Sequence, residues 1–161
     1  MELIKQTDQS KLIKYFFAII LGSIALTISA KIKIPFYPVP MTMQTFIVLF
    51  LGLSFGYKIA IGTVSLYLLE GILGLPVFSN SPERGIGLVY FTGPTMGYLI
   101  GFLTASYFAS YVSLKDNIFI VFLKLTLAVS TIYLLGFLWL GTLIGWDKPL
   151  FNLGIQPFLL A

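Results

Sequence analysis

The sequence predicts an all-α membrane protein that crosses the bilayer with five complete helices and begins a sixth. Of the 161 residues, 58% are apolar and only 10% are charged, whereas an ordinary soluble domain carries about 25% charged residues. The apolar residues gather into runs of spanning length, because about 20 helical residues cross a hydrocarbon layer of about 30 Å. Nothing is left over for a soluble domain, so residues 1–161 form one transmembrane domain. The expected spans are 15–30, 41–56, 59–74, 94–112 and 118–145, with the stub of a sixth helix from 157.

The first span follows a lysine-bearing segment. Lys5, Lys11 and Lys14 precede the apolar run 15–30. This arrangement also fits a secretory signal peptide, but the apolar run is longer than the usual core of such a peptide. An uncleaved first helix is therefore expected.

Turn-forming residues separate the later spans. Segment 31–40 contains three prolines, and each proline lacks an amide hydrogen and disfavours a helical residue before it, so an extended loop is expected. "GYK" at 56–58 and "SLKDN" at 113–117 are short turns. The longer loop 75–93 leads to Pro94, which suits the first position of a helix.

The last long run, 118–145, exceeds one perpendicular crossing, so a tilt or an interfacial end is expected. Residues 146–157 form a loop before the stub.

The distribution of basic residues predicts a multi-pass protein of the cell membrane with a cytoplasmic N-terminus, because cytoplasmic loops carry more lysine and arginine. The first span decides this orientation, with three inner lysines against two outer ones. The inner residues are Lys5, Lys11, Lys14, Lys58 and Lys115, and the outer residues are Lys31, Lys33, Arg84 and Lys148.

The residue types exclude several functions. The chain has no histidine and no cysteine, so it lacks the commonest general base, thiol nucleophiles and the usual transition-metal ligands. It also has no phosphate-binding P-loop motif, and its basic residues form no stripe for nucleic acid. An enzyme, a metal site and a nucleic-acid partner are therefore not expected.

Small residues recur at four-residue spacing in two helices, which permits close helix packing in lipid. One set is Gly93, Gly97, Gly101, Ala105, Ala109 and Ser113, and the other is Ala18, Gly22, Ala25 and Ser29. Internal packing and docking onto another membrane protein are both open for these faces.

Two charged residues are candidates for holding a ligand. Glu70 is the only acidic residue within a predicted span, and a charge at the bilayer centre costs about 2.5–3.5 kcal/mol on insertion scales. Hydration at the interface, a ligand, and a pair with Arg84 are the alternatives for this carboxylate. Arg84 is the only arginine, and its planar fork can hold a carboxylate through two hydrogen bonds. Simple exposure beside Glu83 is the alternative for Arg84.

Polar and aromatic residues near the same end would complete a binding mouth. Gln44 can donate and accept hydrogen bonds together, as an amide-like or ureido group requires. Asn80 lies in the turn before Arg84, and Tyr90 offers an amphipathic ring after it. The set suits a small amphipathic acid, although the same residues also suit a membrane interface.

Three motifs, in this order and spacing, resemble the BioY family: "VPMTMQTF" (39–46), "YLLEGILGLPVF" (67–78) and "PERGIGLVYFTGPTMGYLIGF" (82–102). Members of this family are biotin-binding S components of energy-coupling factor vitamin transporters. The resemblance implies a six-helix S-component bundle that captures biotin from outside as its transported ligand, without a cofactor. It also implies a transmembrane coupling protein and two ATP-hydrolysing subunits as partners.

The resemblance further implies roles for individual residues. Arg84 is similar to the family's loop arginine, and Glu70 occupies a position that is polar in the family and near its site. Gln44, Asn80 and Tyr90 would lie around the same ligand. The small face of the first helix resembles the family's alanine-xxx-alanine contact to the coupling protein.

One departure concerns the last helix. Family members continue after a step like Pro157-Phe158 into Gly-Asp and then Lys within a complete sixth helix, whereas this sequence stops at Ala161. The last helix is thus expected to be largely missing, together with an acid and a base that the family uses at the site. The alternative function is therefore a degenerate or scaffold paralogue that docks to the coupling protein without binding vitamin.

Overall fold

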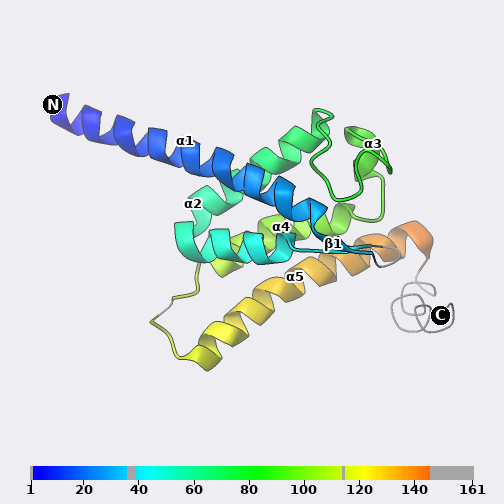
Figure 1. Cartoon of the computed structure of the whole chain (residues 1–161). Helices are drawn as coiled ribbons and strands as arrows, with labels where there is room; N and C mark the ends of the chain where they lie inside the picture. Colours follow the sequence, from blue (N-terminus) through cyan, green and yellow to red (C-terminus); the bar gives the residue numbers. More distant parts are fainter. Residues whose placement is uncertain (1, 36–38, 114, 146–161) are drawn as a thin grey trace.

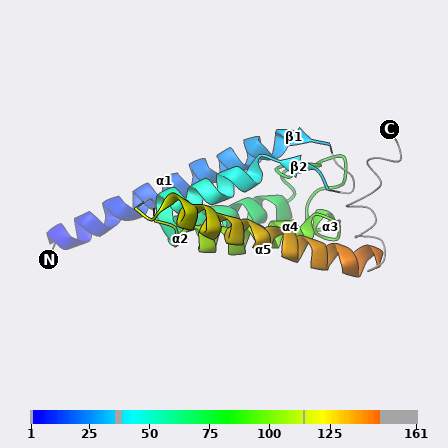
Figure 2. The same ribbon diagram turned by 90° about the horizontal axis from the view of Figure 1, so that it is seen from below.

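The computed structural model of the chain describes residues 2–35, 39–113 and 115–145 and is almost entirely helical. The predicted loop 146–157 and the sixth-helix stub lie outside the described residues. The long helices run side by side, with the start of α1 at one end and the strands and α3 at the other (Figures 1 and 2). The elements in chain order are α1 (Glu2–Lys31), β1 (Lys33–Ile34), β2 (Met41–Thr42), α2 (Gln44–Ile72), α3 (Leu88–Phe91), α4 (Met96–Ala109) and α5 (Ile118–Ile144).

Three helical segments of the described chain are long and apolar enough to cross a membrane: Lys11–Lys31, Gln44–Ile72 and Ile118–Ile144. The apolar helix α4 is shorter, at 14 residues. The three longer segments have the length and composition of membrane spans, as in a multi-pass membrane protein.

Helix α1 begins well before the predicted span 15–30, because the lysine-bearing segment continues the helix back to Glu2. That segment contains neither proline nor glycine, the two residues that cost most in a helix interior. The beginning of α1 projects past the other helices (Figure 1).

Helix α2 is a helical hairpin rather than a single rod, so its 29 residues form two shorter arms and not one continuous span. Gly56 is its one residue with non-helical backbone angles, φ 74° and ψ 173°, a region that glycine adopts readily because it has no Cβ. Gln44 and Tyr67 are 23 residues apart yet hydrogen-bonded, whereas a straight helix would separate them by about 35 Å. The chain therefore reverses at Gly56, where the sequence predicts a turn.

The start of the second predicted span, at residue 41, is too early. Met41 and Thr42 pair antiparallel with Ile34 and Lys33 as a two-stranded hairpin, so the helix begins at Gln44. The partner strand, rather than a helical turn, satisfies the backbone groups of these residues.

Helices α4 and α5 approach each other through glycines. A Cβ on Gly97 would lie 2.4 Å from the carbonyl oxygen of Leu135, and one on Gly101 would lie 2.6 Å from Cα of Ile132. Farther along α4, Ala109 lies against Gly52 of α2. Four of the six residues predicted for this small face are thus buried inside the chain: Gly97, Gly101, Ala105 and Ala109. Gly93 and Ser113 lie outside α4, and Ser113 is exposed.

One ion pair among the described residues lies at the end of the molecule where α5 begins. Lys124 donates to Asp116 at 2.6 Å. This hydrogen bond lowers the pKa of the Asp116 carboxyl below its ordinary value. Lys124 therefore has a structural partner.

Candidate functional site

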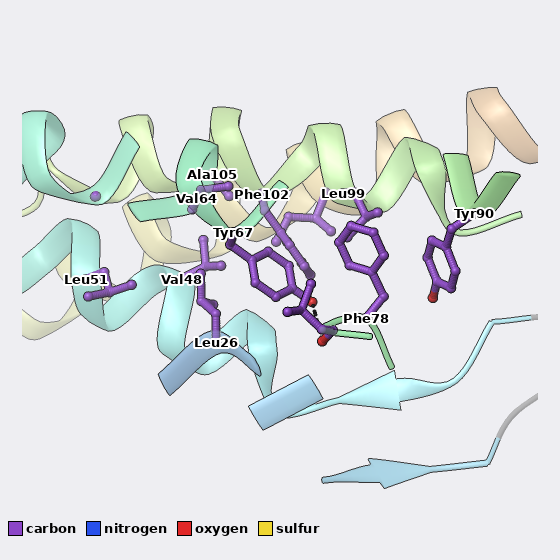
Figure 3. Packing of buried hydrophobic residues seen from close by; sticks show 13 residues of the cluster. Leu26, Val48, Leu51, Val64, Tyr67, Phe78, Tyr90, Leu99, Phe102 and Ala105 are labelled. Atoms are coloured by element: carbon purple, nitrogen blue, oxygen red, sulfur yellow. Dashed lines mark hydrogen bonds between the residues drawn. The ribbon is translucent and has the colours of Figure 1, made fainter. Parts of the chain in front are cut away.

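The predicted site residues lie at one end of the bundle, formed by β1, β2, α3 and the loop between α2 and α3; we call it the hairpin end (Figure 2). An aromatic cluster, the aromatic wall, lies at this end and consists of Tyr67, Phe78, Tyr90 and Phe91. Phe78 stacks on Tyr90 with ring centroids 4.5 Å apart, and it meets Tyr67 and Phe91 edge-to-face at 5.3 and 5.4 Å. Figure 3 shows the rings of Tyr67, Phe78 and Tyr90 in a row. Helix α2, the loop after it and α3 thus build one apolar wall.

Phe78 reaches this position because α2 has a glycine opposite it. A Cβ on Gly71 would lie 2.0 Å from Cζ of Phe78, a distance at which two carbon atoms cannot coexist. The ring is 1% exposed. Gly71 therefore allows the loop to fold back onto its own helix.

A chain of polar groups runs beside the aromatic wall. Thr42 donates to Oε1 of Gln44 at 3.1 Å, and Nε2 of Gln44 donates to the hydroxyl of Tyr67 at 2.7 Å. Tyr67 in turn donates to the carbonyl of Val77 at 3.2 Å. Gln44 is only 3% exposed, so this chain satisfies polar groups that would be costly to bury alone. It joins β2, both arms of α2 and the loop after it.

Glu70 lies half-buried one turn beyond Tyr67 and accepts a hydrogen bond of 2.5 Å from the hydroxyl of Ser23. Ser23 is fully buried. The carboxylate thus links the second arm of α2 to α1. This contact supplies one of the polar partners that an acidic group in a membrane helix requires.

Two lysines connect the start of the hairpin to the turn 78–81. Lys31 donates to the carbonyls of Phe78 and Ser81 at 2.8 and 2.9 Å. Lys33 donates to the carbonyl of Ser79 at 2.9 Å and to Oδ1 of Asn80 at 3.1 Å. Both ammonium groups therefore lie against one four-residue turn.

Asn80 and Arg84 belong to this same turn and its continuation. The amide of Arg84 donates to the carbonyl of Asn80 at 2.8 Å. Asn80 is half-buried, whereas Arg84 is exposed. The backbone at Arg84 is thus tied to the turn that the lysines hold.

The structure therefore gathers the five predicted ligand residues at the hairpin end. Gln44 and Tyr90 belong to the buried wall, Glu70 and Asn80 are half-buried beside it, and Arg84 lies at the surface.

Sequence reasoning missed four residues at this end: Tyr67, Phe78, Lys31 and Lys33. Tyr67 precedes Glu70 by three residues on one helix, a spacing that places both on one face and was a usable signal. The lysine contacts to the turn have no local sequence signal, because the partners are more than 40 residues apart.

The small face predicted on the first helix lies partly inside the bundle. A Cβ on Gly22 would lie 2.6 Å from Cγ2 of Thr63, and Ser29 is 3% exposed. Ala18 and Ala25 are half-buried. Two of the four residues thus contact the chain itself, and a role of this face in binding a partner stays a prediction.

Comparison with known proteins gives a consistent result. Residues 5–161 match the BioY family. A relative from Pyrococcus horikoshii, named "Probable biotin transporter BioY", is 35% identical over 137 residues, which are 84% of this chain and 80% of the relative. "Biotin transporter BioY" of Thermotoga maritima is 33% identical over 135 residues, 83% of this chain and 78% of the relative. These relatives are transporters, not enzymes.

The fold also has a solved counterpart. The crystal structure of the S-component for biotin from an ECF-type ABC transporter superposes with a TM-score of 0.74 at 22% sequence identity. The match covers 92% of this chain and 84% of that one. The two chains share a fold.

Proposed function

Because the chain belongs to the BioY family, we propose that it is the substrate-binding membrane subunit of a biotin transporter. The observation that carries this proposal is the agreement of two independent likenesses over most of the chain. Two relatives are named as biotin transporters, and the fold resembles an S-component for biotin. The hairpin end supplies residues of the chemistry that such a ligand needs.

Biotin combines a carboxylate, an aliphatic chain and a fused ring system with a ureido group. In this proposal Arg84 holds the carboxylate, since a guanidinium can form two parallel hydrogen bonds with it. The wall of Tyr67, Phe78 and Tyr90 packs against the apolar part of the ligand. Gln44 and Asn80 lie near enough to this wall to serve the ureido group, which both donates and accepts.

Glu70 has a different part in the proposal. Its carboxylate already accepts a hydrogen bond from Ser23 of α1, so we expect Glu70 to lie at the edge of the site, beside the ligand. It also keeps α1 and α2 together at the hairpin end.

The hairpin end would face the outside of the cell, with the beginning of α1 in the cytoplasm. Uptake would then depend on partners, because the sequence contains no P-loop to bind ATP. We infer a transmembrane coupling protein and two ATPase subunits as those partners. The small face of α1, at Ala18, Gly22, Ala25 and Ser29, is the proposed contact to the coupling protein.

Isothermal titration of the purified chain with biotin tests the proposal. Nanomolar binding corresponds to about 12 kcal/mol, or about 0.75 kcal/mol for each of the roughly 16 heavy atoms of biotin, which requires an enclosed and well-matched site. Arg84→Ala should weaken biotin binding by about 10- to 100-fold, since a hydrogen bond to a charged group contributes about 1.5–3 kcal/mol. Lys115→Ala, at the opposite end, is the matched control and should leave the affinity unchanged.

A neutral analogue sharpens the test. Biotin amide lacks the carboxylate, so Arg84→Ala should weaken its binding much less than that of biotin. Equal losses for both ligands would show that Arg84 does not hold the carboxylate. A flat titration of the unsubstituted chain, combined with co-purification of the coupling complex, would favour the scaffold alternative.

A further inference from the structure

We propose that Lys31 and Lys33 are positioning residues that hold the turn 78–81, and through it Arg84, beside the proposed site at the hairpin end. This inference rests on the proposed function for its ligand part only. The contacts that carry it are the four hydrogen bonds from the two ammonium groups to this turn.

The hydrogen-bond partners of the turn show how much depends on these lysines. The Phe78 carbonyl accepts from Lys31 and also from the amide and hydroxyl of Ser81. The Asn80 carbonyl accepts from the amide of Arg84. For the carbonyls of Ser79 and Ser81, the lysines are the donors that the described contacts show. Because an unpaired buried carbonyl is costly, removal of the ammonium groups should loosen the turn.

The lysines are well placed to act as fixed points. Lys31 is the last residue of α1, and Lys33 is the first residue of β1. The segment between them is anchored by the hydrogen bond from the amide of Met43 to the carbonyl of Ile32, at 3.1 Å. The turn is thus attached to two elements that are far from it in sequence.

The turn transmits this attachment to Arg84. The amides of Arg84 and Gly85 donate to the carbonyls of Asn80 and Pro82, at 2.8 and 2.9 Å. The side chains of Pro82, Glu83 and Arg84 are exposed. These backbone hydrogen bonds therefore tie the main chain at Arg84 to the turn.

Phe78 anchors the turn from the other side, through its burial in the aromatic wall. The turn is thus held by the two lysines on one side and by Phe78 on the other. With Phe78 retained, loss of the lysines should free the outer part of the turn without unfolding the wall. That difference makes the inference measurable.

The experiment compares the full chain in nanodiscs with the double variant Lys31→Met/Lys33→Met. Methionine keeps the length of the side chain and removes its charge and its donors. Hydrogen–deuterium exchange of the 79–87 amides should become about tenfold faster or more, while exchange in α2 and α4 stays unchanged. The matched control is Lys58→Met/Lys115→Met, which removes the same charge at the opposite end. The single variant Lys33→Met, expected to have a smaller effect, replaces the double variant if the latter fails to fold.

Biotin kinetics provide the second readout. If the lysines hold the turn over bound ligand, the double variant should release biotin about tenfold faster with nearly unchanged association. Lys33→Arg, which retains charge and donors, should stay close to the unsubstituted chain in both measurements. Slower association with unchanged release would instead mean that the lysines act by long-range attraction, and would overturn the inference.

The remaining outcomes are also decisive. Unchanged exchange at 79–87 would show that the lysines do not hold the turn. Faster exchange with unchanged release would show that the turn does not retain the ligand. If the unsubstituted chain binds no biotin, the proposed function fails together with the ligand part of this inference, whereas the exchange data still decide the structural part.

Discussion

At the scale of single residues, the hairpin end depends on side chains that leave room for one another. Phe78 fills the space above Gly71 and brings the loop after α2 into contact with Tyr90. The side-chain amide of Gln44 is hydrogen-bonded to Tyr67 and Thr42, so it shapes the site in the absence of ligand. Gly71 and the buried amide of Gln44 thus set the geometry around the charged residues of the hairpin end.

Gly71→Ala should destabilise the protein by about 1–3 kcal/mol, the usual cost of overpacking a core. The added methyl group would meet the Phe78 ring at 2.0 Å. The midpoint of thermal aggregation in one detergent measures the effect. Gly62→Ala in the same helix is the control, because its Cβ would meet only the side chain of Ile19, with its flexible end at 2.9 Å. Equal midpoints for the two variants would contradict the packing described for Phe78.

At the scale of helices, local sequence patterns predict the bounds of helices and the positions of turns. The apolar run 118–145 gives a helix over Ile118–Ile144, and Gly56 gives the reversal in α2. Met41 and Thr42 begin an apolar run, which predicts a helix, but they pair with Ile34 and Lys33, seven and nine positions earlier. The apolar run that starts at residue 41 does not reveal this pairing, because the partner residues lie before it, on the other side of the prolines.

The same distinction applies to the candidate site. Residue type alone singles out Gln44, Glu70 and Arg84 as polar groups near an apolar segment. It does not reveal that Glu70 meets Ser23, 47 residues away, because that contact depends on how α1 packs on α2. Sequence therefore predicts the kinds of groups at the hairpin end, and the fold decides their partners.

Gly97→Ala should push α4 away from α5. The new methyl group would lie 2.4 Å from the carbonyl oxygen of Leu135 and 2.5 Å from Cβ of Trp139, and backbone atoms cannot move aside cheaply. We expect a loss of about 1–3 kcal/mol, seen as a lower midpoint of thermal aggregation and, in a Trp146→Phe background, a changed emission of Trp139. Ile100→Ala, at a partly exposed position of the same helix, should change both much less. An unchanged Trp139 emission in Gly97→Ala would argue against the close α4–α5 contact.

At the scale of the whole molecule, the two ends of the bundle differ in chemistry. The hairpin end carries the lysine contacts, the turn and the aromatic wall (Figure 2). The opposite end carries the reversal at Gly56 and the Lys124–Asp116 pair. The proposed function requires the hairpin end to face the outside.

Cysteine labelling in intact cells measures this orientation, because the chain has no cysteine of its own. Ile86→Cys, at an exposed position of the hairpin end, should react with a membrane-impermeant maleimide. Lys115→Cys should react only after the cells are permeabilised. The reverse pattern would place the hairpin end in the cytoplasm and remove the basis for uptake from outside.

The glycine contacts between α4 and α5 determine which measurements would detect a loss of helix packing. In a bilayer each helix keeps its own backbone hydrogen bonds even when its neighbour departs, and no hydrophobic force drives the helices together. Loss of the native packing would therefore leave inserted but separated helices, with an almost unchanged circular dichroism spectrum. Only probes that measure the distance between helices would detect this loss.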